Sequence, residues 1–180
     1  MKHLSYSIQD ICSIAIMTAV TAVMAQISIP MPIGVPLTMQ TFAVTLTAII
    51  LGARKGMFAM IIYILLGAVG VPVFSNFSGG VYHLLGPTGG FLFSFPVMAW
   101  LIGWGIEHKS RKGVFPTMLV FGTVVNLLVG SLYYSFIMKT SLEVALAVCM
   151  IPFLPLAVVK AVVAAGLGIK LRRRLRFIKG

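Results

Sequence analysis

The chain has 180 residues, of which 59% are hydrophobic and only 9% are charged, and its formal net charge is +11. A soluble domain carries about 25% charged residues, so this composition indicates an integral membrane protein. At roughly 20 residues for each membrane-spanning helix, the chain has room for about six helices and none for a soluble catalytic or nucleotide-binding domain. We therefore expect an all-α integral membrane protein, one domain over residues 1–180, with six transmembrane helices.

The first apolar segment is expected at residues 11–29. It contains Ala15 and Ala19 four residues apart, followed by Ala22. Small residues at this spacing let another helix approach closely, and that helix belongs either to this chain, as ordinary packing, or to a partner. Residues 30–37 then hold three prolines, one glycine and no charge, so they cannot be helical throughout.

The second and third segments, residues 38–51 and 57–71, are short for membrane-spanning helices. A segment of this length must start below the bilayer surface or be shielded by protein. The second segment opens with the polar residues Thr38, Gln40 and Thr41. We expect this polar opening to face the interior of the protein or a cavity.

A long glycine-rich loop, GGVYHLLGPTGGF at residues 79–91, follows the third segment. Glycine permits positive φ and close backbone approach, and Pro87 fixes its own φ. The loop is uncharged and so suits a neutral polar group of a ligand, although a plain turn between helices is the alternative interpretation. The loop residues that we expect to be available to a ligand are Tyr82, Gly86, Thr88 and Gly89.

Three further segments are expected at residues 91–106, 114–138 and 144–169. Asn126 lies in the middle of the second of these, and Pro152 and Pro155 interrupt the third. A basic tail follows the last segment.

The basic residues are distributed very unevenly between the two sets of loops. Only Lys139 lies in the first, third and fifth loops, whereas the termini and the second and fourth loops hold Lys2, Arg54, Lys55, Lys109, Arg111, Lys112, Lys170, Arg172, Arg173, Arg174, Arg176 and Lys179. Basic residues concentrate on the cytoplasmic side of membrane proteins. Both termini are therefore expected in the cytoplasm, with the proline-rich and glycine-rich loops together on the outer face.

Lys160 is the one basic residue expected inside a membrane-spanning segment. An ionisable group at that depth costs at least ~2.5–3.5 kcal/mol and is by default a functional-site hypothesis. Its side chain is too far from the basic tail to reach the surface, and the only acidic residues, Asp10, Glu107 and Glu143, lie at segment ends. We therefore expect a ligand to supply the anion.

These residues together predict a cavity open to the outside. Its ligand is expected to be small, apolar in the middle, with a carboxylate at one end and a neutral polar group at the other. The candidate binding residues outside the loop are Lys160, Thr38, Gln40 and Asn126. The sequence has no phosphate-binding loop, no pair of embedded carboxylates and no matching halves, and it predicts no metal site and no cofactor. Such a chain would need partners that supply energy.

Three motifs carry a resemblance to a known family: PLTMQTFAV at residues 36–44, LLGAVGVPVF at residues 65–74, and the glycine-rich loop. The chain resembles the substrate-binding S component of energy-coupling-factor (ECF) vitamin transporters, specifically the biotin-binding BioY type. The resemblance covers all six segments and is most specific in the middle third.

The resemblance implies high-affinity capture of biotin outside a prokaryotic cell membrane. A transmembrane coupling subunit and two cytoplasmic ATPases, supplied by other chains, would then drive import and use the ATP. In this family the pattern occupied here by Ala15 and Ala19 docks the coupling subunit. The last helix of the family typically has an aspartate three residues before the lysine, but this chain has Ala157 there, so a contact to the biotin ureido group must come from Asn126 or the loop.

Two other functions stay open at the level of sequence. One is an autonomous carrier or channel for a small carboxylate, which would transport without partners or ATP. The other is a membrane enzyme, for which the outer face offers only His83 and Glu143 as general acid or base.

Overall fold

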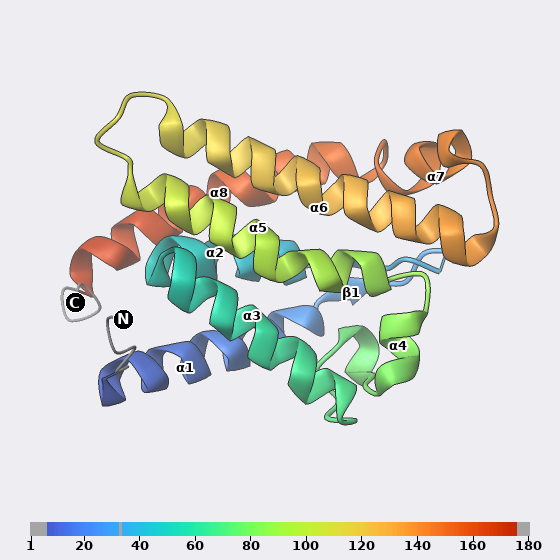
Figure 1. Cartoon of the computed structure of the whole chain (residues 1–180), viewed down its shortest axis with the longest axis horizontal. Helices are drawn as coiled ribbons and strands as arrows, with labels where there is room; N and C mark the ends of the chain where they lie inside the picture. The colour runs from blue at the N-terminus through green and yellow to red at the C-terminus, as the bar shows by residue number, and fades with distance from the viewer. Residues whose placement is uncertain (1–6, 33, 176–180) are drawn as a thin grey trace, which may run out of the picture.

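The computed structural model describes residues 7–32 and 34–175, and helices dominate it (Figure 1). The short strands β1 (Ser28–Ile29) and β2 (Leu37–Thr38) pair antiparallel and turn residues 28–38 into a hairpin. The helices are α1 (Ile8–Ala25), α2 (Gln40–Leu51), α3 (Ala53–Ala68), the 3₁₀ turn η1 (Ser75–Phe77), α4 (Val81–Leu85), α5 (Gly89–Glu107), α6 (Val114–Met138), α7 (Leu142–Cys149) and α8 (Phe153–Arg174).

Helix α2 is the centre of the bundle. Eleven of its 12 residues are buried, because α1, α3, α5 and α8 all pack against it. The expectation that a short second segment must be shielded by protein is therefore confirmed. Helices α5 and α6 form a long antiparallel pair beside this core, and α3 packs between α5 and α1 (Figure 1).

Among the residues that the structure describes, four helices are long and apolar enough to cross a membrane: α1, α5, α6 and α8. The last apolar segment differs from the single interrupted one expected over residues 144–169. It is two separate helices, α7 and α8, because the chain breaks at residues 150–152 and Pro152 precedes the first residue of α8. Pro155 lies in the first turn of α8, where the missing N–H costs no helical hydrogen bond.

The two ends of the bundle differ in charge. The start of α1, the α2–α3 junction, the α5–α6 loop and the end of α8 lie together at one end, and the hairpin, α4 and α7 lie at the other (Figure 1). Lys139 lies at the second end, and the first end gathers the other described basic residues of the loops and the tail: Arg54, Lys55, Lys109, Arg111, Lys112, Lys170, Arg172, Arg173 and Arg174. Lys2, Arg176 and Lys179 lie outside the described residues.

The junction between α2 and α3 consists of one residue, Gly52, whose φ is +84°. The guanidinium of Arg172 donates to the carbonyl oxygens of Ile49 (2.6 Å) and Ile50 (3.3 Å) at the end of α2. The carboxylate of Glu107 accepts a hydrogen bond from the N–H of Ala53 (2.8 Å) at the start of α3. A cation at a helix C-terminus and an anion at a helix N-terminus both interact favourably with the helix dipole. The two residues come from α8 and α5, so these two helices hold the α2–α3 junction in place.

Close packing of α5 on the same junction makes Gly103 a test of the fold. A Cβ atom at Gly103 would lie 2.4 Å from the backbone nitrogen of Ala53, which cannot move aside. We expect Gly103→Ala to lower the free energy of unfolding by about 1–3 kcal/mol, as overpacking typically does, measured by thermal unfolding in detergent. Gly166→Ala in α8 is the control, because nothing lies within 4 Å of its added Cβ. Equal stability of the two variants would contradict this packing.

Candidate functional site

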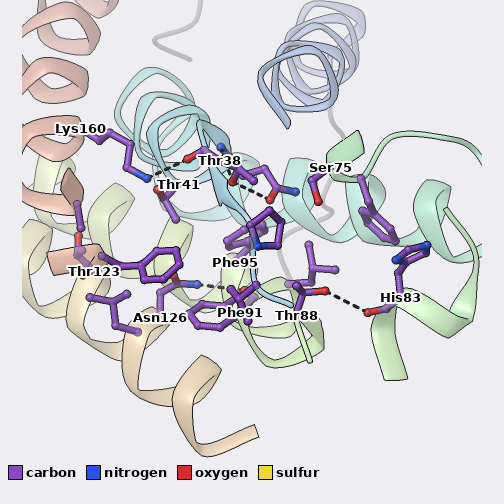
Figure 2. A pocket seen from close by; sticks show the side chains of 18 of the residues that line it. Thr38, Thr41, Ser75, His83, Thr88, Phe91, Phe95, Thr123, Asn126 and Lys160 are labelled. Carbon is purple, nitrogen blue, oxygen red and sulfur yellow. Dashed lines mark hydrogen bonds between the residues drawn. The ribbon is translucent and has the colours of Figure 1, made fainter. Parts of the chain in front are cut away.

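A cavity lies between the hairpin, the start of α2, the segment that includes η1 and α4, and helices α5, α6 and α8 (Figure 2). Its volume is about 60 Å³. Its walls combine hydrogen-bonding groups with aromatic rings. The polar lining includes Thr38, Gln40, Thr41, Thr88, Asn126 and Lys160, and the rings are those of Phe74, Phe91, Phe95 and Phe153. Ligand sites commonly have this mixture of apolar walls and a few polar groups.

Among the described residues that line the cavity, Lys160 is the one that brings an ammonium group. It projects from α8, is only 8% exposed, and donates a hydrogen bond to the carbonyl oxygen of Thr38 at 2.9 Å. None of the three acidic residues, all of them described, lines the cavity. Asp10 pairs with Lys55, Glu107 binds the start of α3, and Glu143 lies in the first turn of α7. The cavity therefore presents a buried positive charge without a carboxylate to balance it.

A chain of hydrogen bonds fixes the polar start of α2. The Thr38 hydroxyl donates to Oε1 of Gln40 (3.0 Å), and Nε2 of Gln40 donates to the hydroxyl of Tyr63 (2.7 Å), which donates to the carbonyl of Val73 (2.9 Å). Tyr63 is fully buried in α3. Gln40 thus connects the hairpin, α2, α3 and the segment before η1, and its amide is largely used within the protein.

Asn126 reaches the cavity from the middle of α6 and is 1% exposed. Its Nδ2 donates to the carbonyl oxygen of Phe91 (3.1 Å) and to the hydroxyl of Ser94 (2.7 Å), both on α5. These two bonds use both amide hydrogens and orient the side chain. The atom of Asn126 that remains to meet a ligand is the carbonyl oxygen Oδ1.

The glycine-rich loop divides between the cavity and a hollow beside it. We call this second space the outer hollow; the loop residues Tyr82, His83, Gly86 and Thr88 line it. His83 and Thr88 also line the cavity. Tyr82 is 83% exposed and does not line the cavity. Gly89 lines neither space. A Cβ atom at this position would lie 1.9 Å from the carbonyl oxygen of Leu84, so close packing of the backbone explains why this residue is a glycine.

The cavity also contains residues that the sequence did not single out. Thr123 lies one turn before Asn126 on α6, and Phe153 lies on α8 with Lys160. The spacing of one helical turn from Asn126, a predicted residue, could have identified Thr123. Ala157, the position where the family resemblance leads one to expect an aspartate, is 7% exposed and lines the cavity one turn before Lys160.

Ala15 and Ala19 lie far from these residues in sequence and on the outer side of α1. Both are exposed, whereas Ile14, Met17 and Thr18 on the opposite side of the helix are buried, and Thr18 donates to the carbonyl of Ala59 in α3. The two alanines therefore do not pack inside the bundle.

Comparisons with known proteins agree on one family. Residues 1–177 match the model of the BioY family. The chain is 38% identical to the biotin transporter BioY2 of Lactococcus lactis over 90% of this chain and 89% of that protein, and 39% identical to the biotin transporter BioY of Thermotoga maritima over 88% and 92%. Among solved structures it resembles the S component for biotin from an ECF-type ABC transporter, with a TM-score of 0.84, 25% identity and 92% of each chain covered.

The isolated charge of Lys160 should cost stability in the absence of a ligand. Because Lys160→Met keeps the volume and removes the buried ammonium, we expect it to raise the free energy of unfolding by about 1–3 kcal/mol, measured by thermal unfolding in detergent. Lys170→Met is the control, because Lys170 is exposed on the same helix. A loss of stability in Lys160→Met but not in the control would show that the ammonium is well compensated within the protein.

Proposed function

Because this chain belongs to the BioY family, we propose that it binds extracellular biotin with high affinity as the substrate-capture subunit of an ATP-driven energy-coupling-factor importer. The observation that carries this proposal is the buried ammonium of Lys160, which has no carboxylate beside it and faces a cavity of neutral hydrogen-bonding groups and aromatic rings. Biotin has a carboxylate at one end of an aliphatic chain and a neutral ureido ring at the other. Its chemistry complements that of the cavity.

In the proposed complex the biotin carboxylate binds at Lys160, beside the start of α2. The aliphatic chain and the sulfur-containing ring pack among the phenylalanines that line the cavity. The ureido N–H groups then need acceptors. The carbonyl oxygen of Asn126 is one, and backbone carbonyls of the glycine-rich loop are others, since Ala157 offers none through its side chain.

The hairpin acts as a lid in this proposal. The cavity volume of about 60 Å³ is below the roughly 150 Å³ of an engineered cavity that accepts benzene, so biotin needs the outer loops to move as it enters. The outer hollow, with Tyr82 and Gly86, is the route in. Ser28 in β1 donates to Oδ1 of Asn76 (2.6 Å), and this bond holds the lid against η1. Gln26 at the end of α1, just before the hairpin, binds the backbone of Phe74 and Phe77.

The membrane arrangement follows from the charge distribution. We propose six membrane-crossing helices, α1, α2, α3, α5, α6 and α8, in a single unit over residues 1–180, with both termini in the cytoplasm of a prokaryotic cell and the cavity open to the outside. The chain binds no cofactor of its own and catalyses no reaction. A transmembrane coupling subunit, docked at Ala15 and Ala19, and two cytoplasmic ATPases supply the energy for import.

The proposal is tested by titrating the purified, detergent-solubilised chain with biotin and with biotin amide. Charge-assisted hydrogen bonds contribute roughly 1.5–3 kcal/mol, so we expect Lys160→Ala to weaken biotin binding about 10-fold to 100-fold and to bind biotin and its amide almost equally. Lys170→Ala should behave like the natural chain. Unchanged biotin affinity in Lys160→Ala would move the carboxylate away from this residue, and a natural chain that does not bind biotin would overturn the proposed function.

Docking of the coupling subunit is tested by adding bulk to the exposed side of α1. Since close helix approach requires small residues, we expect Ala15→Trp and Ala19→Trp to bind biotin normally but to fail in co-purification with the coupling subunit and the ATPases. Ile16→Trp is the control, because Ile16 is 61% exposed on the same helix but off the line through the two alanines. A normal complex with either alanine variant would contradict docking here. Biotin uptake into vesicles that contain this chain alone would indicate an autonomous carrier.

A further inference from the structure

One buried hydroxyl in the cavity has no hydrogen-bond partner. Oγ1 of Thr41 is enclosed, and it neither donates nor accepts a bond in the described structure. Buried polar side-chain atoms are rarely left in this state in proteins, and each exception needs a reason. Two other threonines among the described residues, Thr47 and Thr140, share this property, but neither lines the cavity.

The other threonine hydroxyls that line the cavity are already engaged. Thr38 donates to Gln40, Thr88 donates to the carbonyl of His83 (3.4 Å), and Thr123 donates to the carbonyl of Leu119 one turn earlier (2.8 Å). Threonines in helices commonly make this last kind of bond to the preceding turn. Thr41 differs from all three, so its hydroxyl is free to bind a group that enters the cavity.

Thr41 and Lys160 belong to the same end of the cavity. Thr41 lies in the first turn of α2, three residues after Thr38, whose carbonyl oxygen accepts the bond from Lys160. In Figure 2 Thr41 and Lys160 lie together on one side of the cavity and His83 lies on the other. The N-terminal end of α2 also favours negative charge at this place. A hydroxyl here is placed to meet the same ligand group as the ammonium.

We propose that the Thr41 hydroxyl donates a hydrogen bond to the carboxylate of bound biotin beside the Lys160 ammonium, and that it contributes to the preference for the acid over the amide. This inference rests on the proposed function and extends it to a residue that orients and selects the anionic end of the ligand. A hydroxyl suits this role because it donates to an anion without adding a second buried charge, and a hydrogen bond to a charged group is stronger than one to a neutral group.

The test compares three variants in titrations with biotin and biotin amide. Thr41→Val replaces the hydroxyl by a methyl group of similar volume, Thr41→Ser keeps the hydroxyl, and Thr47→Val removes the buried unpartnered hydroxyl outside the cavity. We expect Thr41→Val to weaken biotin binding about 10-fold and to weaken amide binding clearly less. Thr41→Ser and Thr47→Val should stay within about 3-fold of the natural chain. Thermal unfolding without ligand shows that the variants are folded.

Each outcome decides one part of the inference. Natural biotin affinity in Thr41→Val overturns the contact altogether, and an equal loss for biotin and its amide overturns the assignment to the carboxylate. A comparable loss in Thr47→Val shows that removal of a hydroxyl from α2 acts through the helix rather than the ligand, which also overturns the proposal. If the natural chain fails to bind biotin, the proposed function has failed, and this result is distinct from all three.

Discussion

The bond between the Lys160 ammonium and the carbonyl oxygen of Thr38 joins the last helix of the chain to the start of its central one. It places a charge in an apolar bundle where the protein offers a neutral oxygen as the partner. A carbonyl dipole compensates an ammonium only in part. The arrangement therefore lowers the stability of the free protein, and under the proposed function the same charge favours an anionic ligand.

The contacts around this bond show how a short, deeply buried helix can have a polar start. Thr38 and Gln40 fix the start of the helix to α3 through the hydroxyl of Tyr63. Four helices cover the remaining, apolar part of α2. The polar start of α2 can then lie within the membrane thickness without contact with lipid, which an isolated helix of this composition could not do.

Sequence patterns predicted the helical class, the shielding of α2 and the residues Thr38, Gln40, Thr88, Asn126 and Lys160 that line one cavity. Composition and charge position determine these features, and both can be read directly. Other features depend on packing between distant segments. Gly89 belongs to a conspicuous motif, yet its neighbour is the backbone of Leu84 rather than the cavity, and Tyr82 lies in the outer hollow. The separation of α7 from α8 depends on where the chain turns at Pro152, and the orphan hydroxyl of Thr41 becomes visible only when its surroundings are known.

The α2–α3 junction has a consequence for motion. Glu107 and Arg172 bind the backbone on the two sides of Gly52 and so connect it to α5 and α8. The C-terminal end of α2 is therefore held in place. A helix of 12 residues is roughly 18 Å long. Because α2 is a continuous helix, holding its C-terminal end also positions the polar residues at its N-terminal end. The opening that the proposed function requires therefore falls to the hairpin and the segment around η1, because the other end of α2 is held in place. Under the proposed function, the residues around α2 then determine which ligand binds and the outer loops determine how fast it exchanges, so separate substitutions can alter the two properties independently.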